Sequence, residues 1–224
     1  MKKELFTLFA LFVSFSSYAQ YATRFLGIPI TGSKVDMINK IAQKGFSKTS
    51  YNGFDLEGEF NGTQVGISVV TNNNKVYRVC LQDLHYTDER NVQIRYNNLC
   101  KQFKENGKYL EVNANPIADN EDLSYEIRIH KKRYEAEFSQ SLTDEEMKQL
   151  GEKHIKAIKE KYHLGALDKL EGKVRKEAIE ELSKGMKDIM NNRVVWFMID
   201  ENYGKYGILM FYDNMANKAS GEDL

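Results

Sequence analysis

The chain has 224 residues, and its 12% of aromatic residues with only two prolines is typical of a folded protein rather than a disordered one. Lysine plus arginine and aspartate plus glutamate both total 32, so no net charge draws the chain to polyanions. We therefore expect neither a nucleic-acid partner nor insertion into a membrane.

Residues 1–19 have the pattern of a secretory signal peptide. Two lysines precede the apolar run Leu5–Phe15, and Ser17–Ala19 supplies small residues before an expected cleavage at Gln20. The apolar run is shorter than the roughly 20 residues that a membrane-spanning helix needs. No cysteine stands at the expected new N-terminus to carry a lipid anchor. The pattern predicts a bacterial protein that is periplasmic or secreted.

A first helix is expected to begin after Ser33, where Asp36 completes a carboxylate variant of the capping box, and to end at Gly45. Its expected apolar stripe consists of Val35, Ile38, Ile41 and Ala42.

Residues 54–83 predict three antiparallel strands in a row. Asn61-Gly62 fits a two-residue type I′ turn, in which both central residues need positive φ. A three-residue loop at Asn72–Asn74 would form the second connection and place Val79 beside Ile67. Side chains alternate between the two faces of a strand. The predicted inner face is Phe54, Leu56, Phe60, Val65, Ile67, Val69, Tyr77, Val79 and Leu81, and the predicted outer face is Asp55, Glu57, Glu59, Arg78 and Cys80.

A second helix, capped by Thr87 or Asp88, is expected to run from Glu89 to Lys104. Its core-facing stripe contains Val92, Tyr96, Leu99, Cys100 and Phe103. Cys80 points away from that core, so a sheet would separate the two cysteines. A disulfide requires Cα atoms within about 7 Å, and we therefore predict two free thiols.

Three further segments complete the expected fold. Ser124–Phe138 alternates as a hairpin with its turn at His130–Arg133. Residues 143–190 predict a pair of antiparallel helices, opened by the capping box of Thr143 and broken near His163–Gly165. Residues 193–212 predict a final hairpin that is apolar on both faces. The sequence thus predicts one α+β domain over 20–224, with a possible sub-division near residue 140, in which helices cover one face of an antiparallel sheet.

The run Phe25–Gly32 (FLGIPITG), a helix ending at Lys44–Phe46, and the hairpin on Asn61-Gly62 resemble a group of uncharacterised small secreted proteins of Gram-negative bacteria. These begin with Phe-(Met/Leu)-Gly-Ile-Pro after the signal peptide. The resemblance covers roughly residues 24–110 and implies an exported α+β protein, but no activity. The order of helix then meander is also similar to a unit of β-lactamase-inhibitor-like and outer-membrane-assembly lipoprotein folds. That likeness is topological and does not imply a function.

The sequence predicts no catalytic, cofactor-binding or metal site and no cofactor. The four histidines, His85, His130, His154 and His163, fall in different segments without the spacing of metal ligands. His154 lies on an apolar helical stripe, where a packed histidine is more usual than a ligand. No glycine-rich phosphate loop and no nucleophile elbow is present in the sequence.

The outer face remains the main candidate for binding. Asp55, Glu57 and Glu59 could hold a cation or a partner, although carboxylates on a strand usually form a solvated face; Arg78 would balance part of their charge. Cys80 beside Arg78 could have a lowered pKa, although a packed strand cysteine is the commoner case. The basic residues expected at a hairpin tip, Arg128, Lys131, Lys132 and Arg133, could contact an acidic partner or form an ordinary polar turn.

These observations predict a non-enzymatic binding or interaction module of the cell envelope, whose partner, a protein or a ligand, is left open. One alternative is an envelope hydrolase whose site is assembled from residues distant in sequence. Another is a structural component of the envelope. A pocket that joins His85, His154 or His163 to carboxylates would favour the hydrolase.

Overall fold

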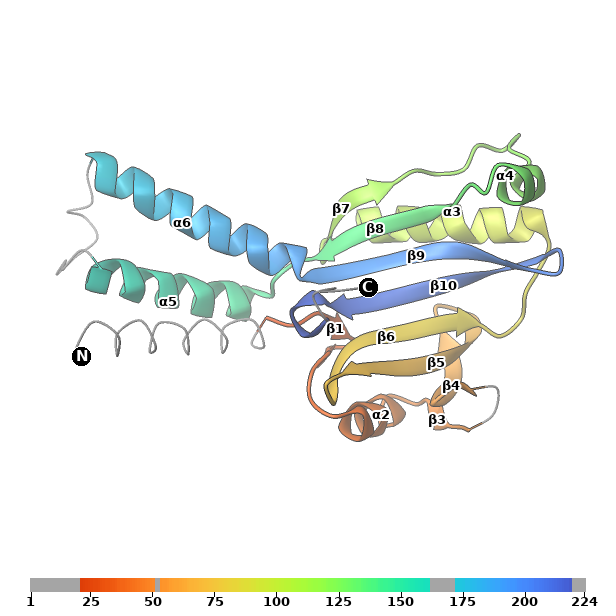
Figure 1. The fold of residues 1–224 in the computed structure, drawn as a ribbon, viewed down its shortest axis with the longest axis horizontal. Coiled ribbons are helices and arrows are strands. Elements are labelled where there is room, and N and C mark those ends of the chain that lie inside the picture. The colour runs from red at the N-terminus through yellow and green to blue at the C-terminus, as the bar shows by residue number, and fades with distance from the viewer. Residues whose placement is uncertain (1–20, 51–52, 162–171, 219–224) are drawn as a thin grey trace.

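The computed structural model describes residues 21–50, 53–161 and 172–218 and has the predicted α+β fold with an antiparallel sheet (Figure 1). The expected signal peptide and the expected helix break at His163–Gly165 lie outside these residues. The strands are β1 Arg24–Phe25, β2 Ile28–Pro29, β3 Ser47–Lys48, β4 Leu56–Phe60, β5 Thr63–Asn72, β6 Lys75–Asp83, β7 Tyr109–Ala114, β8 Glu135–Gln140, β9 Arg193–Asn202 and β10 Lys205–Asn214. The helices are α2 Lys34–Ala42, α3 Glu89–Glu105, α4 Leu123–Ile129, α5 Asp144–Lys161 and α6 Gly172–Asn191, with a 3₁₀ turn, η3, at Met215–Asn217.

One unit of a helix and four strands occurs twice along the chain. The large sheet has the order β3-β4-β5-β6-β10-β9-β8-β7, so each run of four strands begins at an edge and ends in the centre. Helix α2 precedes the first run and contacts β5 and β6, while α3 precedes the second and contacts β7, β9 and β10. The antiparallel pairing of β6 with β10 joins the two units into one continuous sheet.

Helices α2 and α3 cover the same side of the sheet, which we call the inner face; the opposite side is the outer face. The predicted stripe of α3 is buried, and Tyr96 packs edge-on against Phe197 with ring centroids 5.4 Å apart. On α2 the buried residues are Met37 and Ile41. Val35, expected in that stripe, is 66% exposed. Two residues turn a helix by about 200°, so Val35 points away from the sheet when Met37 faces it.

The first connection of the 54–83 meander is confirmed. Asn61 and Gly62 have φ of 50° and 74°, as a type I′ turn requires. The turn fixes the register of β4 against β5, in which Leu56 faces Ile67 as predicted. The apolar positions of both strands therefore reach the same face.

The second connection is shorter than predicted. Asn73–Asn74 form a two-residue turn with positive φ at both residues, which shifts the register by one residue from the prediction. With the bulge that follows, Val79 faces Val69, a difference of two residues. A bulge then inserts Tyr77 between two paired positions. Val76 takes the buried position expected for Tyr77, because the bulge shifts the alternation by one residue.

The hairpin predicted over Ser124–Phe138 is wrong: its first half is the helix α4. The Asp122 carboxylate caps this helix by accepting from the Tyr125 N–H (2.8 Å). Tyr125 and Ile129 are four residues apart and both exposed, so their spacing fits one side of a helix as well as a strand. Strand β8 pairs instead with β7, an edge strand whose residues 110–113 are exposed and which the sequence analysis does not predict.

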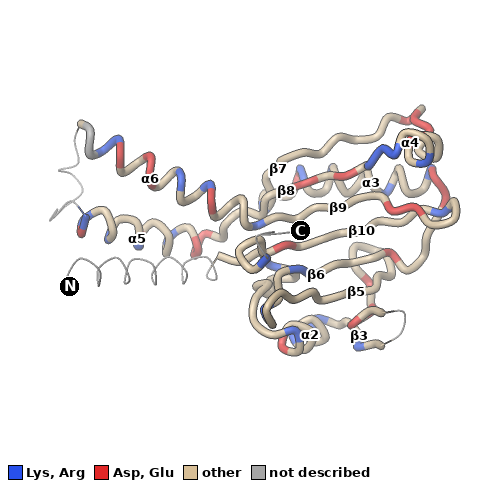
Figure 2. The backbone as a smooth tube through the Cα atoms, in the orientation of Figure 1, with Lys and Arg blue, Asp and Glu red and all other residues tan. Residues whose placement is uncertain are grey.

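Helices α5 and α6, which we call the arm, form the predicted pair and project beyond the end of the sheet (Figure 1). The capping box is present: the Thr143 N–H donates to Glu146 Oε2 (2.9 Å), and the Glu146 N–H donates to Thr143 Oγ1 (3.2 Å). Lys161 and Glu181 form an ion pair between the helices. Figure 2 shows both basic and acidic residues along each of these helices. Within the described residues, no helix combines the length and apolar character needed to cross a bilayer.

A buried arginine ties the arm to the sheet. Arg193, at the start of β9, is fully buried, and its guanidinium donates to the carbonyls of Gln140 (2.9 Å), Ser141 (3.0 Å) and Tyr21 (3.0 Å). It also lies 3.4 Å from the carboxylate of Glu146 in the first turn of α5. The end of β8, the start of α5 and the first described residues therefore meet at one side chain.

Candidate ligand-binding site

Aromatic and long apolar side chains gather on the outer face, away from α2 and α3. Two neighbouring rows cross its centre: Ser68, Cys80, Phe211 and Trp196 in one, and Gly66, Gln82, Leu209 and Met198 in the other. Charged residues are sparse in the middle of the central strands and gather toward strand ends and loops (Figure 2). The centre of the outer face is therefore aromatic and apolar, whereas the carboxylates predicted for this face lie on or just before β4, near the edge of the sheet.

Two aromatic rings lie on glycines of this face. A Cβ atom on Gly66 would come within 2.5 Å of the Phe54 ring, and one on Gly207 within 2.6 Å of the Tyr86 ring. Glycine inside a strand commonly marks such a close approach. Each ring can therefore rest directly on the backbone of the sheet.

Phe54 was expected on the inner face, and the structure places it on the outer one. Asp55 donates its N–H to the Ile67 carbonyl (2.8 Å), although Leu56 already faces Ile67. Two residues thus oppose one, as in a bulge, which reverses the alternation before β4. The Asp55 carboxylate holds this arrangement by accepting from the Val69 N–H (2.7 Å).

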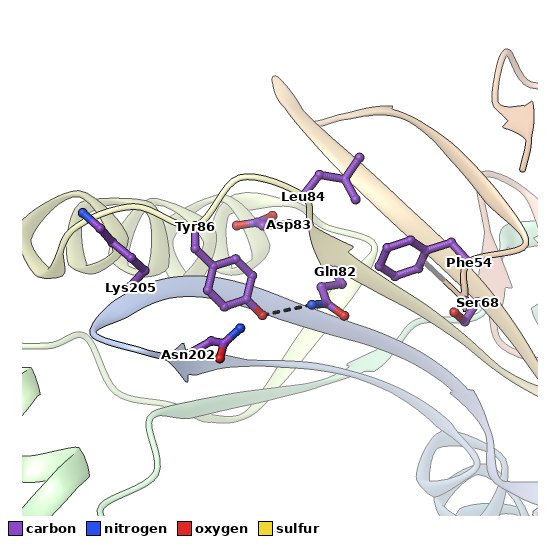
Figure 3. Close-up of a pocket in the computed structure, with 9 residues that line it drawn as sticks. Phe54, Ser68, Gln82, Asp83, Leu84, Tyr86, Asn202 and Lys205 are labelled. Atoms are coloured by element: carbon purple, nitrogen blue, oxygen red, sulfur yellow. Dashed lines mark hydrogen bonds between the residues drawn. The ribbon is translucent and has the colours of Figure 1, made fainter. Parts of the chain in front are cut away.

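The space between the two rings is an open cleft of about 660 Å³, lined also by Ser68, Gln82 and Leu84 (Figure 3). Gln82 donates from Nε2 to the Tyr86 hydroxyl (3.1 Å), which donates in turn to Asp200 Oδ2 (2.5 Å). Burial, and then the Asp200 carboxylate, raise the pKa of Tyr86 far above its usual value. The phenol is therefore a neutral donor held in a fixed direction.

Of the charged residues around this cleft, Asp83 is paired within the protein. Asp83 accepts from Arg95 at both carboxylate oxygens (2.8 and 2.9 Å) and from the Ile208 N–H (3.0 Å). Asp200 accepts the Tyr86 hydroxyl hydrogen. Lys205 lines the cleft from an exposed position at the start of β10. The cleft interior therefore offers mainly aromatic surface and neutral polar groups.

A second group of aromatic residues lies further along the outer face, and we call Arg78, Trp196, Phe211 and Asp213 the Trp196 cluster. Trp196 and Phe211 stack with centroids 4.0 Å apart and an interplanar angle of 17°. The Arg78 guanidinium lies over the Phe211 ring (4.7 Å) and makes two bonds to Asp213 (2.6 and 2.7 Å). Trp196 Nε1 also donates to Asp213 (3.1 Å). A smaller hollow of about 330 Å³ borders this cluster.

The carboxylates predicted for the outer face do not form a joint site. Asp55 forms an ion pair with Lys34 of α2 (2.9 Å). Glu57 is half-buried and Glu59 exposed on the short strand β4. Arg78 binds Asp213 rather than any of them, because β10 lies beside β6 and brings Asp213 opposite Arg78. The predicted charge balance on this face is therefore wrong.

Both cysteines are free thiols, Cys80 on the outer face and Cys100 buried in α3. The suggested net lowering of the Cys80 pKa is wrong, and the alternative of a packed strand cysteine is confirmed. Burial dominates and raises the pKa of Cys80 to about 11, although Arg78 acts in the opposite direction. Burial also raises the pKa of Cys100 to about 11. Neither thiol is therefore an activated nucleophile.

The histidines do not come together. His85 is exposed after β6, His130 contacts Glu126 at the surface (3.0 Å), and His154 packs beside Gly185 in the arm. His163 lies outside the described residues. Within residues 21–50, 53–161 and 172–218, no group of three or more histidine, cysteine or acidic side chains could hold a metal ion.

The basic residues expected at a hairpin tip lie instead at the end of α4 and in the loop after it. Arg128, Lys132 and Arg133 form ion pairs with Glu201, Glu121 and Glu135 respectively. Their positive charge is thus shared with nearby carboxylates.

Sequence reasoning missed the cleft. No sequence pattern marks Gln82, Ser68 or Tyr86, and the predicted alternation places Phe54 on the wrong face. The available signal was Gly66 and Gly207, each inside a run of strand-forming residues, where glycine suggests close approach of another group. That signal does not say which ring approaches, because the contacts come from segments far away in sequence.

Comparison with known proteins finds no family, no curated protein and no solved structure that matches this chain. The function is therefore argued from the geometry of the cleft.

Proposed function

We propose that the protein is an exported, non-enzymatic binding module of the bacterial cell envelope, periplasmic or secreted, which binds its ligand in the cleft between Phe54 and Tyr86. The export signal at 1–19 supports the location. One observation carries the binding role: two aromatic rings flank an open cleft whose floor has polar groups available for a ligand. Clefts lined by aromatic surface with a few convergent polar groups are the usual form of ligand sites.

The test is ligand retention by immobilised protein that begins at Gln20. An envelope extract is passed over the wild-type protein, over Phe54→Ala/Tyr86→Ala, and over Tyr125→Ala as the control. Tyr125 is 51% exposed on α4 and does not line the cleft. Mass spectrometry then identifies the retained compounds.

The proposal expects a compound that wild type and the control retain and the double variant loses. Equal retention by all three proteins, or retention no better than an empty column, would refute the cleft as the binding site. If the bound compound has a different mass after contact with the protein than in the applied extract, the non-enzymatic role is contradicted.

A further inference from the structure

The two rings of the cleft are arranged as stacking platforms. Phe54 and Tyr86 lie on opposite sides of Gln82 and rest on the strand backbones at Gly66 and Gly207 (Figure 3). Both are half-buried and line the cleft. Because the sheet supports each ring from below, neither must move to accept a ligand. Preorganised aromatic surface of this kind binds flat, apolar faces of a ligand at low entropic cost.

The floor between the rings supplies neutral hydrogen-bonding groups. Gln82 uses its amide N–H on Tyr86, while its Oε1 accepts no hydrogen bond from the described residues. The Ser68 hydroxyl and the Asn202 side-chain amide likewise have no bonded partner in the part of the chain that the structure describes. Together they offer donors and acceptors of the kind that match ligand hydroxyls.

The charge distribution narrows the ligand class. Asp83 forms an ion pair with Arg95, and Asp200, which accepts the Tyr86 hydroxyl hydrogen, does not line the cleft, so among the described residues the cleft presents no unpaired carboxylate of its own to a cation. Lys205 is the one basic residue that lines the cleft among the described residues, whereas polyphosphate ligands are normally held by several basic or backbone N–H groups. A wholly apolar ligand would leave the floor groups without partners, which costs about 1–3 kcal/mol for each buried group.

Resting on the function proposed above, we propose that the ligand is a saccharide. A pyranose ring combines an apolar face of C–H bonds, which stacks on an aromatic ring, with hydroxyls around its edge. Those hydroxyls match Gln82, Ser68 and Asn202. The cleft volume of about 660 Å³ lies within the range of small-molecule sites and accommodates more than one sugar unit. With a ring at each side, the cleft fits a short oligosaccharide stacked on both platforms.

The test is a printed array of neutral, N-acetylated and uronic-acid glycans, including cellotriose, triacetylchitotriose and trigalacturonic acid. Saturation-transfer NMR then measures the dissociation constant of the strongest binder. The expected result is that Phe54→Ala and Tyr86→Ala each weaken binding about tenfold, as the loss of an aromatic stacking contact implies. Tyr125→Ala, on α4 and outside the cleft, should bind within about threefold of wild type. Circular dichroism establishes that each variant is folded.

A blank array, or glycan binding that both alanine variants retain, would overturn the saccharide assignment. The retention experiment separates this failure from that of the proposed function. If an extract compound still requires Phe54 and Tyr86 while the array is blank, the binding role stands and the ligand class is wrong. If neither experiment detects binding that depends on the two rings, both are wrong.

Discussion

At one end of the outer face, Trp196 stacks on Phe211 under the guanidinium of Arg78, whereas at the other end Phe54 and Tyr86 stand apart on glycines. In the Trp196 cluster, the aromatic faces contact each other and the indole N–H and guanidinium both donate to Asp213. Most hydrogen-bonding groups of the Trp196 cluster are therefore already bonded to other groups of the protein.

The cleft contains similar residue types, but they are arranged differently. Its rings contact the backbone rather than each other, and the side-chain oxygen of Gln82 remains available. Aromatic content on a sheet face therefore does not identify a binding site. What distinguishes the two ends is whether the aromatic and polar groups satisfy one another.

The largest expected effect is at the Trp196 cluster. Asp213→Ala leaves the Arg78 guanidinium without its carboxylate, and we expect a loss of about 3 kcal/mol in the free energy of unfolding, measured with urea. Asp213 is 2% exposed, so solvent screens little of this interaction. The matched variant Asp200→Ala, in the half-buried cleft, should cost about 1 kcal/mol or less. Equal losses in unfolding free energy for Asp213→Ala and Asp200→Ala would contradict the view that the Trp196 cluster is the more tightly bonded end of the outer face.

The next effect tests whether Phe54 rests on the sheet. Gly66→Ala places a Cβ within 2.6 Å of three Phe54 ring atoms and should cost about 1–2 kcal/mol. In a Phe54→Ala background the same substitution should cost much less, because the ring is gone. If the losses in unfolding free energy from Gly66→Ala and Phe54→Ala simply add in the double mutant, the Phe54 ring does not rest on Gly66. Gly151→Ala on α5 meets no atom within 4 Å and serves as the control.

A smaller, pH-dependent effect belongs to Tyr86. Its pKa is raised above the ordinary value of 10.0, first by burial and then by Asp200. A raised pKa adds stability below pH 10 and loses it as pH rises further, because the unfolded phenol ionises first. Tyr86→Phe should therefore be about 1 kcal/mol less stable than wild type at pH 8, with a narrower gap at pH 11. Tyr203→Phe, at a 99% exposed position, serves as the control substitution.

The smallest expected effect concerns the rate at which the two thiols react with a disulfide reagent. With pKa values near 11, Cys80 and Cys100 are almost entirely protonated at pH 8, so a disulfide reagent should react slowly with the native protein. Denaturation without reductant should release both thiols. Fast native reaction would indicate that the region around Cys80 is open, and absence of thiols after denaturation would contradict their free state.

Much of the fold follows from local rules that the sequence displays directly. Asn61-Gly62 sets a turn, Asp88 caps α3, and Thr143 opens the arm, because each depends on residues within a few positions of one another. The errors have non-local causes. The strand over Tyr109–Ala114 is an exposed edge without a clear alternation, and its place in the sheet depends on pairing with β8.

The cleft could not be predicted for the same reason. The bulge at Asp55, whose carboxylate accepts from the Val69 N–H, reverses the alternation so that Phe54 faces outward. Tyr86 reaches Gly207 only because β10, more than a hundred residues later, lies beside β6. Residue types and their periodicity do not predict these contacts between separate segments.

The arm gives the protein a natural point of attachment. It leaves the sheet after β8 and returns at β9, which are neighbouring strands with Ser139 facing Val194. Helix α5 has 18 residues and so extends about 27 Å from the sheet. An affinity tag or fluorophore grafted at the far end, beyond the contacts of Arg193 and Glu146, leaves the hydrogen-bond ladder unchanged. Such a handle would orient immobilised protein with the cleft unobstructed.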